Sequence, residues 1–207
     1  MGRCAYYQAI APRLLDRLLS QPRLVLGVLA LQRPSPEARR AEFSAKLASL
    51  TEARREQALQ GFDRLLSLRD LDCLAPDRDR EAWGLEVLRH EGFSAADLAA
   101  EVDIEKRWHR LHEVLERLTV AGSEGLGYAV VGGTELGEDL GYGPLRYLGP
   151  ELVTAAASGL QALAEDAVRA QTDDDYGFDY VWEALVTVRD YYALAAGRGF
   201  AMLLHFG

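Results

Sequence analysis

The chain has 207 residues, of which 49% are hydrophobic and 27% are charged, and its formal net charge at pH 7 is −9. This balance is typical of about one globular domain and excludes an intrinsically disordered chain. The acidic excess repels phosphate backbones and excludes nucleic acid as the expected partner. It favours a basic protein partner or a cationic ligand, or else it serves solubility alone.

Cysteine usage and hydropathy indicate the compartment. The two cysteines, Cys4 and Cys73, form no CxxC motif, so the sequence predicts neither a disulfide framework nor a zinc site, and a reducing compartment fits best. The longest apolar stretch, residues 24–31, is too short to span a membrane, and no signal peptide is evident. We therefore predict a cytoplasmic protein without membrane attachment.

The chain begins with a strand and two helices. Residues 3–10 are rich in β-formers and predict a strand. Pro12 stands where a helix tolerates its missing N–H and opens a first helix, and Pro22 begins a second one that extends to Leu31.

Residues 32–102 predict a mostly helical insertion. The highly charged run over residues 37–74 has the spacing of two helices, and Asp79 is a candidate N-cap for another. Ser94 and Asp97 have the spacing of a capping box.

The clearest helix follows, over residues 104–118, with Asp103 as its N-cap and one narrow apolar stripe. Residues 126–131 are apolar or small on both faces and predict a central strand. A Gly-rich polar loop over residues 132–143 and a short strand over 145–148 come next.

The last quarter predicts two helices and a strand. Pro150 begins one helix, residues 172–175 form an acidic solvated linker, and the final helix covers residues 178–196. Residues 200–206 lack charge and predict a buried strand. Together the elements predict one α+β domain over residues 1–207, in which a small mixed β-sheet of N-terminal, middle and C-terminal strands is packed by many helices.

Four stretches of this sequence resemble the YfbM-like family of bacterial proteins of unknown function. They are Met1-Gly2 with Tyr6-Tyr7; Trp108-x-x-Leu111-His112; Gly132-Gly133 with Gly137-Glu138-Asp139-Leu140-Gly141-Tyr142-Gly143-Pro144-Leu145-Arg146-Tyr147-Leu148; and the closing helix with its Gly-x-Gly turn and apolar strand. The resemblance covers residues 1–31 and 103–207, and it implies an α+β fold without any activity to transfer. The chain departs from the pattern at Gly149, where a Ser or Thr helix cap is more usual, and over residues 32–102, which are longer and less recognisable.

His112 is the most informative single residue, because it lies at the edge of the apolar stripe of its helix. A partly buried imidazole at that position can face a cleft, or it can be a core histidine that bonds a backbone carbonyl. His109 lies three residues before it, but a third ligand is missing and the motif is not HExxH, so we predict no metal and no cofactor.

The segment from Gly132 to Arg146 is the best candidate site. Its glycines permit close backbone approach, and its polar residues provide carboxylates, a phenol and a guanidinium: Glu138, Asp139, Tyr142 and Arg146. The pattern is neither GxGxxG nor a Walker loop, which disfavours nucleotides. The alternative is a structural loop in which Asp139 pairs with Arg146.

Three functional hypotheses follow. The leading one is a non-enzymatic domain that binds a small polar ligand or a protein, as a monomer or homodimer, through the Gly132–Arg146 segment and His112. The first alternative is a hydrolase or transferase with His112 as base, Asp139 as its orienting group and Arg146 as an anion clamp. The second rests on the resemblance, since some such domains are thought to occur near toxin systems: an acidic immunity-type protein that neutralises a basic toxin.

Overall fold

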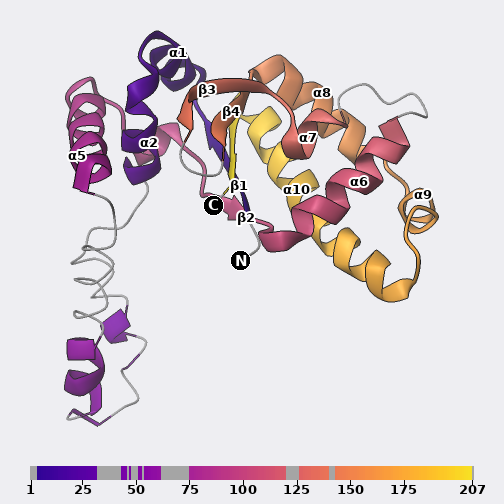
Figure 1. Cartoon of the computed structure of the whole chain (residues 1–207), viewed down its shortest axis with the longest axis horizontal. Coiled ribbons are helices and arrows are strands. Elements are labelled where there is room, and N and C mark those ends of the chain that lie inside the picture. Colours follow the sequence, from indigo (N-terminus) through magenta and orange to yellow (C-terminus); the bar gives the residue numbers. More distant parts are fainter. Residues whose placement is uncertain are drawn as a thin grey trace. The chain divides into compact units, whose positions relative to one another are not determined.

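A computed structural model of the chain describes residues 4–31, 43–45, 47, 51–52, 54–61, 75–119, 126–139 and 143–206. They form two compact units, one comprising residues 1–23 with 93–207 and the other residues 24–92 (Figure 1). The extent of the predicted helical insertion, residues 32–102, stays a prediction, and much of its charged run lies outside the described residues.

The first unit is built on one five-stranded sheet with the order β2-β1-β5-β4-β3. Its strands are β1 (Ala5–Ile10), β2 (Val102–Asp103), β3 (Thr134–Asp139), β4 (Pro144–Leu148) and β5 (Ala201–Phe206). The α+β class is confirmed, but the pairings are antiparallel throughout, so the prediction of a mixed sheet was wrong in that detail. The short link between β3 and β4 allows only antiparallel pairing.

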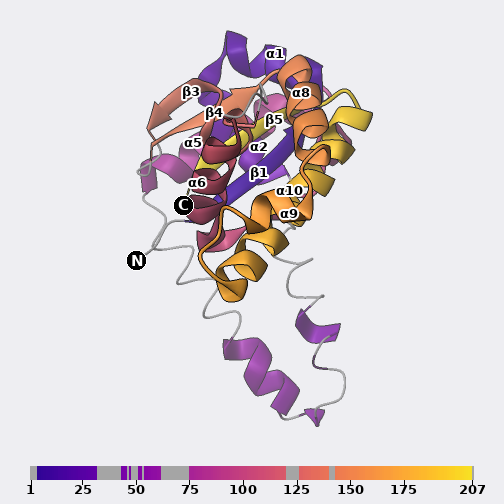
Figure 2. The ribbon, with the colours of Figure 1, turned by 90° about the vertical axis from the view of Figure 1, so that its right-hand side faces the viewer.

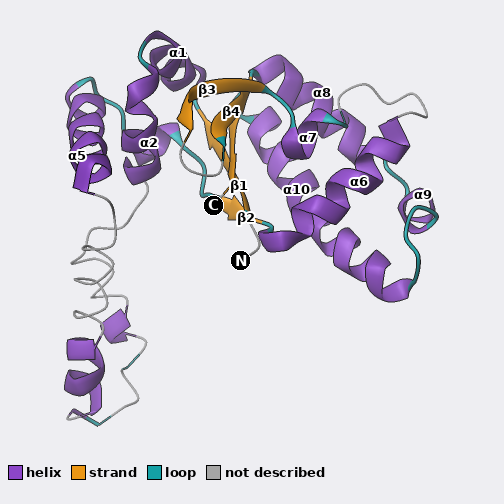
Figure 3. Ribbon diagram, in the orientation of Figure 1, coloured by secondary structure: helices purple, strands orange, loops and turns teal. Residues whose placement is uncertain are grey.

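Helices accompany this sheet (Figure 3). They are α1 (Pro12–Ser20), α6 (Trp108–Thr119), α7 (Tyr128–Val131), α8 (Pro150–Gln161), α9 (Glu165–Arg169) and α10 (Asp175–Gly197), with short 3-10 turns at Ala95–Asp97 and Glu105–Arg107. In Figures 1 and 2, α8 and α10 lie along one face of the sheet. No helix among the described residues is both long and apolar enough to cross a membrane.

Local signals predicted most helix starts to within a few residues. The capping box at Ser94 is confirmed, with the Ala96 N–H donating to the Ser94 hydroxyl and the Ser94 N–H to the Asp97 carboxylate. The final helix begins at Asp175, earlier than predicted, because the Asp174 carboxylate accepts the Gly177 N–H at 2.7 Å and caps it. The acidic stretch over residues 172–175, predicted as a solvated linker, therefore includes the N-cap and the first residue of α10.

The middle of the chain departs most from prediction. Residues 126–131 form a turn and the short helix α7 instead of a central strand. A six-residue apolar run has no periodicity that separates a buried strand from a buried helix. Packing decides: the Ala129 carbonyl accepts a hydrogen bond from the Tyr192 hydroxyl of α10 at 3.0 Å, and both residues are fully buried. The middle strands are β3 and β4.

The core between the sheet and α10 contains three tyrosines. The Tyr191 hydroxyl accepts the Ala9 N–H of β1 at 2.8 Å. Burial raises the pKa of Tyr191 to about 12 and raises the pKa of Tyr7 and Tyr192 as well, so all three stay protonated at neutral pH. The Tyr7 hydroxyl is buried without a hydrogen-bond partner among the described residues.

The second unit contains α2 (Val25–Leu31), preceded by a 3-10 turn at Pro22–Leu24, and α5 (Ala75–His90). Helices α2 and α5 touch at two glycines, since a Cβ added to Gly27 would lie 2.3 Å from the Gly84 carbonyl carbon. Helix α5 begins at Ala75 rather than at Asp79, because a proline in the first turn, here at position 76, costs a helix no hydrogen bond.

Candidate functional site

The segment from Gly132 to Arg146 is a β-hairpin, not a loop. Strands β3 and β4 pair in the register Thr134 with Tyr147, Glu135 with Arg146 and Leu136 with Leu145. Strand β3 is mostly exposed and, among the described strands, has a single neighbour in the sheet. The glycine-rich composition therefore belongs to an edge hairpin.

Two glycines at the start of this segment have a structural task. A Cβ on Gly132 would lie 2.2 Å from the Tyr128 Cα, so glycine lets the chain turn closely over the end of α7. Gly133 has a φ of +97°, and a Cβ there would lie 2.5 Å from the Tyr147 carbonyl oxygen. Backbone geometry alone explains both residues.

The polar residues of the hairpin bond within it. The Arg146 guanidinium lies 2.7 Å from the Glu135 carboxylate directly opposite, so its partner is not the predicted Asp139. The Asp139 carboxylate accepts the Gly143 N–H at 2.8 Å and helps close the turn. Glu138 is exposed on β3, and Tyr142 lies outside the described residues.

His112 lies on α6 beside a cavity of about 790 Å³. Its side chain is 23% exposed, at the edge of the buried stripe formed by Leu111, Val114 and Leu115. The His112 Nε2 lies 3.3 Å from the Glu116 carboxylate one turn further on. Its Nδ1 is buried and has no hydrogen-bond partner among the described residues. The ring therefore has one polar atom whose bonding capacity is unused.

The walls of this cavity, named the His112 cavity below, come from three helices and the residues directly before and after α7. They include His112, Glu116, Tyr128, Gly132, Leu152 and Ala155. The predicted meeting of the α6 histidine with the glycine-rich segment therefore occurs at Gly132. Glu138, Asp139 and Arg146 do not line the cavity. An extended strand of six residues carries Glu138 and Asp139 up to roughly 20 Å along the sheet edge. Arg146 returns on β4 to lie opposite Glu135, and its guanidinium bonds to the Glu135 carboxylate.

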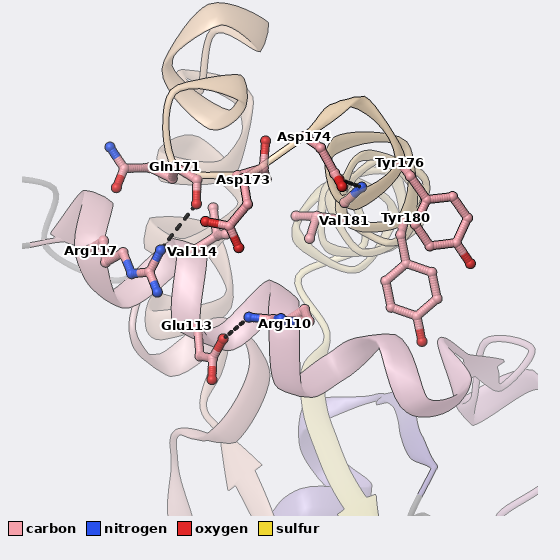
Figure 4. A pocket seen from close by; sticks show the side chains of 12 residues that line it. Arg110, Glu113, Val114, Arg117, Gln171, Asp173, Asp174, Tyr176, Tyr180 and Val181 are labelled. Atoms are coloured by element: carbon pink, nitrogen blue, oxygen red, sulfur yellow. Dashed lines mark hydrogen bonds and ion pairs between the residues drawn. The ribbon is translucent and has the colours of Figure 1, made fainter.

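A second cavity, of about 420 Å³, lies on another side of α6 (Figure 4). We name it the α6–α10 cleft. Helix α6 contributes Arg110, Glu113 and Arg117, and the start of α10 contributes Tyr176 and Tyr180, with Asp173 from the preceding residues. The sequence reasoning missed this cleft; the available signal was the pair of tyrosines four residues apart directly after an acidic run.

Metal binding finds no support in the described residues, where no group of three or more His, Cys, Asp or Glu side chains is close enough to hold an ion. His109 and His112 instead each lie 3.3 Å from the glutamate one turn further along α6, Glu113 and Glu116. Each imidazole is thus paired with a separate glutamate at the i, i+4 position.

Comparison with known proteins shows the family and the fold. A model of the family described as "Domain of unknown function (DUF1877)" matches residues 1–205, including the stretch over 32–102 that motifs alone do not cover. No curated protein matches the sequence. The crystal structure of YfbM, a protein of unknown function from Escherichia coli, is similar with a TM-score of 0.51 and 14% identity, over 97% of this chain and 98% of that one. At that identity the likeness shows the fold alone. The predicted YfbM-like relationship is thus confirmed, and the chain belongs to the DUF1877 family.

Proposed function

We propose that this protein is a binding protein whose ligand occupies the His112 cavity, with an apolar body against α7 and α8 and one polar group at the pair formed by His112 and Glu116. The observation that carries the proposal is the position of an incompletely bonded imidazole at a largely apolar cavity. A concave apolar surface with a few convergent polar groups is the usual form of a small-molecule site.

The apolar walls support a ligand with a hydrophobic body. Tyr128 is 51% exposed and Leu152 is 45% exposed, and both line the cavity. Large apolar side chains left open to water on facing elements gain free energy when a ligand covers them, at about 25 cal/mol for each Å² removed from water.

The imidazole supports a ligand with a hydrogen-bonding group. When Nε2 donates to the Glu116 carboxylate, Nδ1 is the lone-pair nitrogen that lacks a donor. A buried polar atom without a partner costs roughly 1–3 kcal/mol. A bound molecule with a donor group that reaches this nitrogen would supply the missing partner.

The enzymatic alternative has less support, because it requires His112, Asp139 and Arg146 in one place. Of these three residues only His112 lines the cavity. The carboxylate close to the imidazole is Glu116, which is 63% exposed, and an arginine that could clamp an anion is missing from the lining among the described residues.

The test uses three simple probes, phenol, benzamide and benzoate, with binding measured by saturation-transfer NMR. Ala155 and Ser158 are both exposed on α8, but only Ala155 lines the cavity. We expect Ala155→Trp to block the cavity and weaken binding of at least one probe about tenfold or more, whereas Ser158→Trp leaves it unchanged.

The substitution His112→Leu separates shape from hydrogen bonding. It retains an apolar wall but removes the ring nitrogens, so we expect it to discriminate among the three probes instead of abolishing all binding. Failure of every probe to bind the unmodified protein, or binding that survives Ala155→Trp, would contradict the proposal.

A further inference from the structure

The α6–α10 cleft differs in chemistry from the His112 cavity. Its lining combines charged side chains of both signs with two tyrosine rings, and in Figure 4 the Asp173 carboxylate lies in the middle, between Arg117 on one side and the tyrosines on the other. The class of ligand that the cleft can bind depends on which of these groups are not already bonded within the protein.

The cationic groups of the cleft are already bonded. The Arg110 guanidinium lies 3.1 Å from the Glu113 carboxylate, and Arg117 donates to the Gln171 carbonyl at 3.1 Å. The N-terminus of α10 is closed as well, because the Asp174 carboxylate accepts the Gly177 N–H. An anion would meet committed donors and three consecutive aspartates, so the cleft disfavours anions.

The Asp173 carboxylate and the Tyr176 ring are available. Asp173 is exposed, and no described residue pairs with its carboxylate. Tyr176 is 79% exposed, the highest value among the exposed large hydrophobic residues in the described part of the chain. Its ring stacks near that of Tyr180, with centroids 6.5 Å apart and an interplanar angle of 19°. A carboxylate and aromatic faces that line the same cleft are suited to a cation.

The same helix start shows how such an arrangement holds a guanidinium. The Cζ of Arg169 lies 3.7 Å from the centroid of the Phe178 ring, while its Nη1 lies 2.8 Å from the Asp175 carboxylate. The aspartate and the ring that hold Arg169 are three residues apart. Asp173 and Tyr176 have the same sequence spacing two residues earlier, with Asp173 just before the helix, and no arginine among the described residues lies between them.

We propose that the α6–α10 cleft binds an arginine side chain of a basic protein partner, with its guanidinium between the Asp173 carboxylate and the Tyr176 ring. A planar guanidinium both stacks on an aromatic face and pairs with a carboxylate, which a lysine ammonium does less well. The net charge of −9 would speed the approach of a basic partner. This inference is independent of the ligand proposed for the His112 cavity.

The test is an NMR titration of the full-length, isotope-labelled protein with the capped peptide Gly-Gly-Arg-Gly-Gly, and with the same peptide carrying Lys or Glu in place of Arg. We expect the arginine peptide to shift the backbone amides of residues 173–181 and to bind more tightly than the lysine peptide, and the glutamate peptide to leave these amides unshifted.

Matched variants distinguish a specific contact from general acidity. Asp173→Asn should weaken binding of the arginine peptide about three- to tenfold, whereas Asp179→Asn, which removes the same charge from an exposed position outside the cleft, should weaken it less than about twofold. Tyr176→Ala should weaken binding about three- to fivefold, while Tyr176→Phe, which retains the aromatic face, should bind nearly as the unmodified protein does.

The proposal is overturned if the two aspartate variants weaken binding equally, because the attraction would then be a property of the whole acidic surface. It is also overturned if the glutamate peptide binds as well as the arginine peptide, or if the shifted amides lie outside the cleft. Since each substituted side chain is exposed, we expect every variant to fold.

Discussion

The hairpin of β3 and β4 and the helix α6 make an instructive comparison. The hairpin has the more site-like sequence, rich in glycine and charge, yet its described polar side chains Arg146 and Asp139 bond within the hairpin itself. Helix α6 has the sequence of an ordinary amphipathic helix, yet its polar residues line two cavities, with His112 at one and Arg110 at the other. Residue types that suit chemistry become a site only where the surface is concave.

The difference follows from where each element lies. Strand β3 is at the end of the sheet order and pairs with one described strand, so its exposed side chains project into solvent. Helix α6 lines one cavity together with α7 and α8 and the other together with α10, and both cavities lie where side chains of different elements leave space. Several converging elements create a cavity, which a single edge strand cannot do.

The largest expected effect tests whether the hairpin glycines are structural. Gly133→Ala forces a Cβ against the Tyr147 carbonyl at a φ of +97°, so we expect the free energy of unfolding to fall by about 2–4 kcal/mol, measured by urea denaturation. Gly197→Ala is the control, because a Cβ there meets open space at the end of α10 and should be neutral or stabilising by up to about 1 kcal/mol. Equal stability of the two variants would mean that the hairpin tolerates a side chain at this glycine.

A smaller effect concerns the wall of the His112 cavity. Tyr192→Phe removes the donor to the buried Ala129 carbonyl of α7, so we expect a loss of about 1–2 kcal/mol in the free energy of unfolding. Tyr7→Phe is the matched control, since Tyr7 is equally buried but its hydroxyl has no partner among the described residues, and we expect a change within about 0.5 kcal/mol. A large loss in Tyr7→Phe would reveal a partner for that hydroxyl, such as an ordered water.

The smallest effect concerns the ion pair of the hairpin. A double-mutant cycle of Arg146→Ala and Glu135→Ala should give a coupling free energy of about 0.2–1 kcal/mol that decreases with added salt, because both side chains are solvent-accessible, at 31% and 60%. Neither variant should change the binding of phenol, benzamide or benzoate. Loss of probe binding in Arg146→Ala would show that the hairpin contributes to the ligand site, as α6 does.

The sequence predicted the features that depend on neighbours along the chain. The apolar stripe of α6 placed His112 at the edge of a buried face, the capping box at Ser94 was recognisable, and the strands β1 and β5 followed from their β-forming or uncharged runs. Each of these signals is contained within a few residues, because helix and strand periods and cap hydrogen bonds are local.

Only the tertiary structure decided the rest. Residues 126–131 became a turn and a helix because of the distant Tyr192, and both cavities combine residues 20 or more positions apart, such as His112 with Leu152 and Arg110 with Tyr176. Such contacts arise when packed elements bring their side chains together, and no local pattern records which elements will meet. The physical reason is that local hydrogen bonding selects an element, whereas long-range burial selects its neighbours and hence its sites.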